Sequence, residues 1–165
     1  MCMKYVNTTA TCYKSVVVEN NAIISFNAPF DAIKASSDND TLYIDDFSIV
    51  TQIDFLGTNT NEHKMENPLE QNKVVDFIVR LTKCNKDDDK RIGSDLDKFS
   101  VDLGEMREKN LVATACFDFL NYTRVTNVNR LELPGGPGRY VLKVLIKMSE
   151  DEEYTIQSMT SLNVL

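Results

Sequence analysis

Residues 131–148 of the chain read LELPGGPGRYVLKVLIKM, and this stretch decides the fold class. After the glycines, every second residue is apolar. These residues are Tyr140, Leu142, Val144, Ile146 and Met148. Because successive side chains of a strand point to opposite faces, this period of two predicts a half-buried β-strand. The charged segment SEDEE (149–153) follows, and residues 154–164 alternate again, so we predict a β-hairpin at the end of the chain.

Other segments share this alternation and are rich in β-branched residues. The further predicted strands are 15–19, 22–26, 42–53, 75–81, 99–103, 111–119 and 125–133. Polar turns separate them, and helical signal is weak, with 102–110 the best candidate. We therefore predict an all-β protein, an antiparallel two-sheet β-sandwich of about eight strands with at most a short helix near 102–110. We expect residues 1–165 to form one sandwich domain, and a small closed barrel is the alternative.

Composition sets limits on the partners. The chain has 165 residues, of which 42% are hydrophobic and 26% charged, enough for one domain with a sizeable core. The net charge of −7 repels phosphate backbones, and three aspartates dilute the densest basic segment, KDDDKR (86–91). We therefore expect no nucleic-acid partner.

The N-terminal segment and the cysteines bear on the compartment. The chain has no apolar run long enough to span a membrane, and its first residues lack the apolar core of a signal peptide. We therefore expect a cytoplasmic protein without a membrane partner. In that compartment cysteines are usually reduced thiols. The four are Cys2, Cys12, Cys84 and Cys116.

The glycine-rich segment GGPG (135–138) raises the question of a phosphate site. A phosphate-binding loop of the G-x-x-x-x-G-K-[ST] type lies between a strand and a helix, and its backbone amides point at the phosphate. Here a strand-like pattern follows the glycines, no Lys-Ser or Lys-Thr is present, and Pro137 lacks an amide hydrogen. We interpret GGPG as a turn that joins two strands.

We predict no catalytic residues. His63 is the single histidine, and it lies in the polar stretch TNTNEHKMEN. No serine has the surroundings of an activated nucleophile. Asp45 and Asp46 are adjacent, so on a strand they point to opposite faces and cannot converge on one bond.

Calcium is the one metal for which we find candidate residues, because acidic residues gather in the turns. The candidates are Asp38, Asp40, Asp87 and Asp89. Residues 87–97 do not match a calcium-binding EF-hand loop, because the sixth position is Ile92 and not glycine. Solvated acidic turns are the alternative interpretation. We expect no cofactor, and a zinc site is disfavoured by the single histidine and scattered cysteines.

Some predicted strands carry apolar residues on their mixed face as well. These are Ile78, Val112, Val141 and Leu145. They indicate either central strands buried on both faces or a surface that another subunit covers. The sequence leaves both alternatives open.

Three segments together resemble a family of small uncharacterised bacterial proteins. They are 19–35 (ENNAIISFNAPFDAIKA), 75–88 (VDFIVRLTKCNKDD) and 130–147 (RLELPGGPGRYVLKVLIK). The shared pattern ends its first segment near Phe30 and opens a late strand with Leu133, Pro134, Gly138 and Tyr140. The resemblance implies a sandwich of the C2-like or immunoglobulin-like kind in a bacterial cytosol. It carries no established activity and no functional residues.

The sequence therefore favours a non-catalytic protein-binding or assembly module, with a protein partner or self-association as the contact. A structural component of a phage or mobile-element particle is the alternative. An enzyme, or a sandwich that binds calcium, is a weaker hypothesis.

Overall fold

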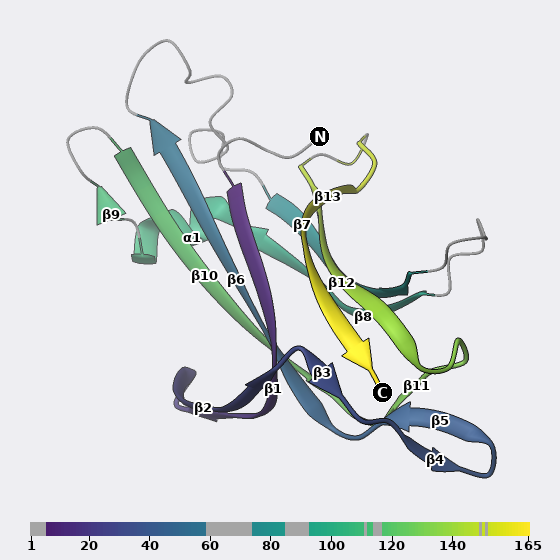
Figure 1. Ribbon diagram of the computed structural model, residues 1–165. Coiled ribbons are helices and arrows are strands. Elements are labelled where there is room, and N and C mark those ends of the chain that lie inside the picture. The colour runs from purple at the N-terminus through teal and green to yellow at the C-terminus, as the bar shows by residue number, and fades with distance from the viewer. Residues whose placement is uncertain are drawn as a thin grey trace.

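A computed structural model describes residues 6–58, 74–84, 93–110, 112–113, 117–148, 150 and 152–165. Two five-stranded sheets face each other, and a small three-stranded sheet lies at one end (Figure 1). The first sheet has the order β2 (Ala22–Phe30), β1 (Val6–Glu19), β6 (Phe47–Thr58), β10 (Phe117–Val128) and β9 (Val112–Ala113). The second has the order β3 (Ala32–Ile33), β13 (Thr155–Val164), β12 (Gly138–Lys147), β7 (Val74–Lys83) and β8 (Gly93–Asp102). The small sheet has the order β11 (Leu131–Glu132), β5 (Thr41–Ile44) and β4 (Ser36–Asp38).

This architecture confirms the predicted all-β, sandwich-like class. Eight of the described strands have nine or more residues, close to the predicted number, and five are shorter. Among the described strands, the five-stranded sheets end in β2 and β9 and in β3 and β8, and these strands do not close into a barrel. Two details of the prediction were wrong. A third sheet exists, and β13 pairs with β3 in parallel rather than antiparallel orientation.

The stretch that decides the fold class lies in the middle of the second sheet. β12 pairs antiparallel with β7 on one side and with β13 on the other, which confirms the C-terminal hairpin. All five apolar residues predicted to share a face are buried in the core: Tyr140, Leu142, Val144, Ile146 and Met148. Their alternation is thus the inward face of a central strand.

The core lies between the two five-stranded sheets. Phe77 of β7 lies against Phe55 of β6, with ring centroids 6.2 Å apart, and stacks on Phe99 of β8 at 5.3 Å. Phe55 and Phe77 are fully buried and come from opposite sheets. Aromatic pairs of this kind add to the free energy gained by burying apolar surface. One cluster of buried side chains joins the two sheets, while the single-domain prediction for 1–165 stays a prediction.

Three predicted strands are interrupted, and one of them, 125–133, is divided between β10 and β11. The segment 111–119 contains β9 and the start of β10, which pair with each other as antiparallel strands. Alternation continues through both, so it could not show that the chain reverses. The segment 42–53 is likewise divided between β5 and β6, and the break falls at Asp45 and Asp46.

The predicted short helix is present as α1 (Leu103–Asn110). The carboxylate of Asp102 accepts a hydrogen bond from the backbone amide of Glu105, at 3.1 Å. This is the contact of an N-cap, which satisfies one of the free amides of the first turn. Leu103 is fully buried and anchors the start of the helix.

Candidate functional site

The predicted calcium candidates are divided by the structure. Asp38 ends β4 and Asp40 lies in the turn before β5, whereas Asp87 and Asp89 lie outside the described residues. The carboxylate of Asp38 forms an ion pair with the Arg130 guanidinium at 3.3 Å. Among the residues that the structure describes, no group of three or more His, Cys, Asp or Glu side chains could hold a metal ion. Calcium binding therefore stays a prediction.

The segment GGPG forms the turn between β11 and β12, as predicted. The Gly136 amide donates to the Leu133 carbonyl at 2.9 Å, so this amide is already used inside the turn. The Gly136 carbonyl accepts from the Tyr140 hydroxyl at 2.6 Å, and the Gly135 carbonyl accepts from the Lys83 ammonium group. Gly136 has a φ of 72°, a conformation that glycine adopts without strain.

Of the residues considered for catalysis, the structure describes only Asp45 and Asp46. His63 lies outside the described residues. Asp45 accepts a hydrogen bond from the Ser36 hydroxyl at 3.0 Å, and Asp46 accepts one from the Arg130 backbone amide at 3.0 Å. The two neighbouring carboxylates therefore stabilise two different segments near the small sheet.

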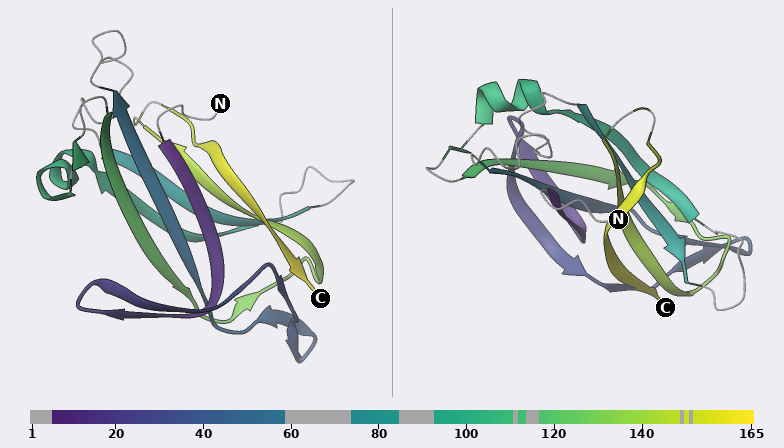
Figure 2. Two further views of the ribbon diagram at one scale, coloured as in Figure 1. Left: turned by 60° about the vertical axis from the view of Figure 1, so that its left-hand side comes forward. Right: turned by 90° about the horizontal axis from the view of Figure 1, so that it is seen from above.

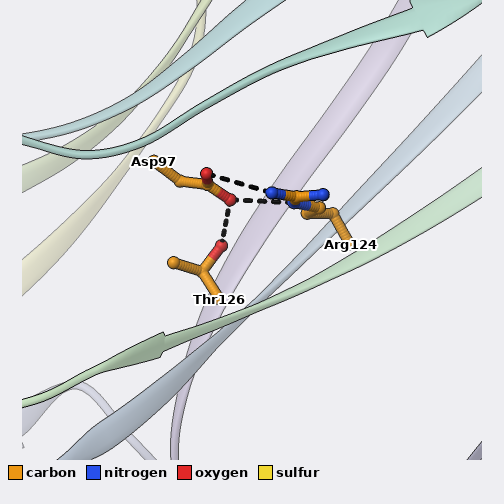
Figure 3. A network of polar contacts seen from close by, with 3 residues as sticks. All are labelled: Asp97, Arg124 and Thr126. Atoms are coloured by element: carbon orange, nitrogen blue, oxygen red, sulfur yellow. Dashed lines mark hydrogen bonds and ion pairs between the residues drawn. The ribbon is translucent and has the colours of Figure 1, made fainter.

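A polar network that the sequence analysis missed connects the two five-stranded sheets (Figure 3). Asp97 of β8 accepts two hydrogen bonds from the Arg124 guanidinium of β10, at 2.9 and 3.2 Å. It also accepts one from the Thr126 hydroxyl at 2.5 Å. The guanidinium lies 5.0 Å from the centre of the Phe99 ring, within the range of a cation–π contact. The network thus ties the edge of one sheet to the other.

The same network sets the ionisation of Asp97. Burial by itself would raise the pKa of this carboxyl, but the hydrogen bonds from Arg124 and Thr126 and the charge of Arg124 outweigh burial and lower it. Asp97 is therefore a carboxylate at neutral pH, held by a guanidinium that is also charged. Through Arg124 and Thr126, this carboxylate joins β8 to β10.

The sequence contained a signal for this network. Leu120, Tyr122, Thr126 and Val128 lie at alternate positions of β10 and face the core or its margin, and Arg124 lies between them in the same series. A charged side chain at an inward position needs a partner, since burying an unpaired charge is costly. That reasoning predicts an acidic residue opposite Arg124, although it does not identify Asp97.

A second feature that the sequence analysis missed is a projecting hairpin. β1 pairs with β6 only as far as Tyr13, and beyond that residue it pairs with β2 alone. Residues 13–30, which we call the arm, turn away from the first sheet and run across the direction of β6 and β10 (Figure 2, left). Asn20 and Asn21 form the turn, with φ values of 50° and 61°. Two positive φ values are what a type I′ hairpin turn requires, and asparagine tolerates them.

The arm carries a concentration of exposed apolar side chains. Val17, Val18, Ile24 and Phe26 are 44%, 47%, 54% and 48% exposed. They make up half of the large hydrophobic residues that are exposed in the described part of the chain. Tyr13 packs against Phe26 with ring centroids 5.0 Å apart, which fixes one aromatic pair on the arm. Exposed apolar patches of this kind mark contact surfaces.

An open cleft of about 520 Å³ lies between the arm and the first sheet. The arm contributes Val18, Ile23 and Phe26, together with the turn residue Asn21. Opposite them lie Gln52 of β6 and residues 122–125 of β10. The cleft is therefore apolar on the side of the arm and mixed on the side of the sheet.

The outer edge of the arm is a strand edge without charge. β2 ends the first sheet, and none of its nine residues is charged. β8, which ends the second sheet, carries Asp95, Asp97, Lys98 and Asp102. Charged side chains are one means by which proteins protect strand edges from pairing with other chains. β2 lacks this protection.

A smaller cleft of about 370 Å³ opens between β1 and β13. Cys12 lines it together with Phe30, Leu142 and Leu162. Burial raises the pKa of the Cys12 thiol to about 12, so this thiol is protonated and unreactive at neutral pH. Cys12 is therefore a core residue beside the cleft, and Cys84 is an exposed free thiol.

Burial within the chain itself explains two of the apolar residues on the mixed faces of the predicted strands. Ile78 and Leu145 are only 5% and 6% exposed in the isolated chain, on the central strands β7 and β12. The alternative of buried central strands is thus confirmed for these two residues, whereas Val141 is half-buried and the side chain of Val112 is not described. In the part of the chain that the structure describes, no helix is long and apolar enough to cross a membrane.

Comparison with known proteins identifies no family. No family model matches the chain, and no curated protein matches it. The resemblance to small bacterial sandwich proteins therefore stays a prediction. Among solved structures, the chain is similar to the CooA pilin subunit from enterotoxigenic Escherichia coli, with 8% identity, a TM-score of 0.40 and 97% of each chain covered. At this TM-score the two folds are only loosely alike.

Proposed function

We propose that this protein is a non-catalytic binding or assembly module of the cytoplasm, and that it binds another protein chain through the arm. The observation that carries the proposal is the set of four exposed apolar side chains on one hairpin, namely Val17, Val18, Ile24 and Phe26. Burying such side chains against a partner is favourable by about 25 cal/mol for each Å² removed from water. The arm holds half of the exposed large hydrophobic residues in the described part of the chain.

The charge of the arm also supports a protein partner. Residues 13–30 contain one cation, Lys14, and one anion, Glu19, so the arm has a net charge of 1 − 1 = 0 in a chain of −7. Interface cores are depleted of charged residues and rich in aromatic ones. Tyr13 and Phe26 supply the aromatic pair. A neutral, partly aromatic hairpin matches a protein surface better than it matches a nucleic acid.

Site-specific photocrosslinking tests this function. A photoreactive benzoylphenylalanine replaces Phe26 on the arm, or replaces Met159 of β13 in the matched control, because Met159 is 63% exposed and lies on the second sheet. We expect a discrete adduct from position 26 in cells that make the protein, and none from position 159. The adduct should disappear when Val17→Ser and Ile24→Ser are added.

The identity of the crosslinked protein distinguishes a binding module from a structural component of a larger particle. One protein of defined mass, identified by mass spectrometry, supports a binding module. A ladder of many copies of this chain supports a structural component of a larger particle, such as that of a phage or mobile element. Equal labelling from both positions, or labelling from neither, contradicts a binding role for the arm.

A further inference from the structure

We propose that the partner of the arm is a second copy of this chain, bound by antiparallel pairing of the two β2 edges. The inference rests on the proposed function, because it assigns an occupant to the same surface. Pairing of this kind would join the first sheets of two copies into one continuous sheet. It depends on three properties of β2, namely its free edge, its self-complementary sequence and its lack of charge.

The free edge is defined by the strand order. β2 is the last strand of the first sheet and pairs with β1 alone. Its other edge therefore has no strand partner among the described residues. Residues 22–27 (AIISFN) offer amides and carbonyls along this edge, and Pro29 ends the usable stretch because proline has no amide hydrogen. Apolar, uncharged six-residue segments of this type pair readily with other strands.

The sequence of β2 is complementary to itself. In an antiparallel pair with two-fold symmetry about Ser25, residue 24 of each copy lies opposite residue 26 of the other. The dimer would therefore contain two equivalent cross-strand pairs, each between Ile24 of one copy and Phe26 of the other. Both side chains are about half exposed in the isolated chain. Aromatic residues opposite β-branched residues are among the favourable cross-strand pairs.

Charge favours this edge over that of β8, the other long strand at the end of a five-stranded sheet, for contact between copies. Two-fold pairing sets a strand opposite itself, so any net charge on the strand is repelled by its own copy. β8 carries three aspartates and one lysine, a net charge of 1 − 3 = −2, whereas β2 carries none. Each chain has a net charge of −7, so two copies need a neutral surface on which to meet. Residues 13–30 provide it.

The proposed β2–β2 contact involves few residues and joins only two copies. The bulge between Val17 and Val18 leaves Ile24 without a register partner on β1, and a bulge bends an edge strand. The bulge lies within the pairing segment, next to Ser25, and Pro29 lies just beyond its end. Few backbone groups can therefore pair, so we expect a dimer that dissociates on dilution. A two-fold contact uses the same surface on both copies, so assembly stops at two.

Sedimentation equilibrium tests the proposal with a charge-swap pair. Ser25 is exposed, so Ser25→Lys and Ser25→Asp should fold as the wild type does, which circular dichroism and the melting temperature verify. We expect the wild-type mass to rise from one copy to two between about 10 µM and about 1 mM, the range of weak association. Each variant alone should dimerise at least about tenfold more weakly, because like charges face each other at the symmetry centre. An equal mixture of the two variants should regain the dimer.

Ser94→Lys is the matched control, because it places the same charge at an exposed serine of β8, which is also a long edge strand. It should leave dimerisation unchanged. A wild type that stays monomeric over the whole range overturns the proposal, as does a Ser25→Lys protein that dimerises normally. If the mixture of the two variants stays monomeric, Ser25 does not face Ser25 of the second copy. If the wild type forms assemblies larger than two copies, the contact is not a two-fold dimer contact.

The result also separates this inference from the proposed function. If the wild type is monomeric but position 26 still crosslinks a different protein in cells, then the arm binds a partner and only the second copy is wrong. If no adduct forms at position 26 either, both proposals are wrong.

Discussion

Replacing Asp97 with alanine tests the link between the two sheets. The variant removes three hydrogen bonds that the carboxylate accepts, two from Arg124 and one from Thr126. The Asp97 side chain is only 12% exposed, so the lost interactions lie mostly out of water, whereas the Arg124 side chain is 39% exposed and can be partly rehydrated. Breaking a fully buried pair costs about 3–5 kcal/mol, and an exposed pair contributes about 0.2–1 kcal/mol. We expect Asp97→Ala to lower the free energy of unfolding by about 2 kcal/mol, between these limits.

Urea unfolding at pH 7, followed by circular dichroism, measures this loss. For a chain of this length, about 2 kcal/mol corresponds to a fall in melting temperature of about 4–8 °C. Asp95→Ala is the matched control, because Asp95 pairs with Arg80 through the same two guanidinium nitrogens, and its side chain is 48% exposed. Solvent screens that pair, so Asp95→Ala should cost less than about 1 kcal/mol.

The pH dependence gives an independent check. The pKa of Asp97 is lowered in the folded protein, because the hydrogen bonds and charge of Arg124 outweigh the opposing effect of burial. A lowered pKa means that the stabilisation is fully present above the unfolded value, near 4, and is lost as pH falls through the folded value. The difference between the wild type and Asp97→Ala should therefore shrink as pH is lowered below about 4. A loss under about 0.5 kcal/mol at pH 7, or a difference that does not shrink in acid, would refute this account.

Three further predictions concern the core, a turn and the thiols. Phe77→Ala removes a fully buried ring between the sheets and should cost about 4 kcal/mol in urea unfolding, and an unchanged midpoint would contradict the packing described here. Tyr140→Phe removes the 2.6 Å hydrogen bond to the Gly136 carbonyl and should cost about 1 kcal/mol, whereas a neutral effect would mean that water replaces the bond. Burial raises the pKa of Cys12 to about 12, so at pH 7 a thiol reagent should modify the exposed Cys84 and spare Cys12 until the protein is unfolded, as peptide mapping by mass spectrometry would show. Rapid modification of Cys12 in the folded protein would contradict its placement in the core.

Strands whose two faces differ could be predicted from the sequence. β12, β13 and β7 were found within one or two residues, because one side of each strand faces the core and the other carries polar residues. The class of fold followed from these strands. The short helix near 102–110 was also predicted correctly, and Asp102 at its N-cap explains where it begins.

Chain reversals inside an alternating pattern could not be predicted. The segment 111–119 kept its period of two although it contains parts of two paired strands. β1 was predicted to begin at residue 15 and begins at Val6, since its inward residues include Thr8, which has no apolar signature. Periodicity shows which side chains share a face, but it does not show where a strand turns back.

The candidate site was largely beyond the reach of sequence. Asn20 and Asn21 between two apolar runs are a signal for a type I′ hairpin, so the existence of the arm was predictable in principle. That the arm leaves the sheet after Tyr13 depends on where β6 ends its pairing with β1. This is a long-range property, which the local pattern of apolar residues does not show.

A comparison of two apolar pairs on different sheets shows why the arm is the better candidate for a contact. Ile78 and Leu145 lie opposite each other on central strands, and both are almost fully buried. Adding a partner there would gain little, because little apolar surface remains in contact with water. Ile24 and Phe26 have neighbours on one side only, since β2 is the last strand of its sheet, and both remain about half exposed. Exposed apolar surface and unpaired strand backbone thus occur together at β2. One additional strand would bury these side chains and would also form hydrogen bonds with the β2 edge.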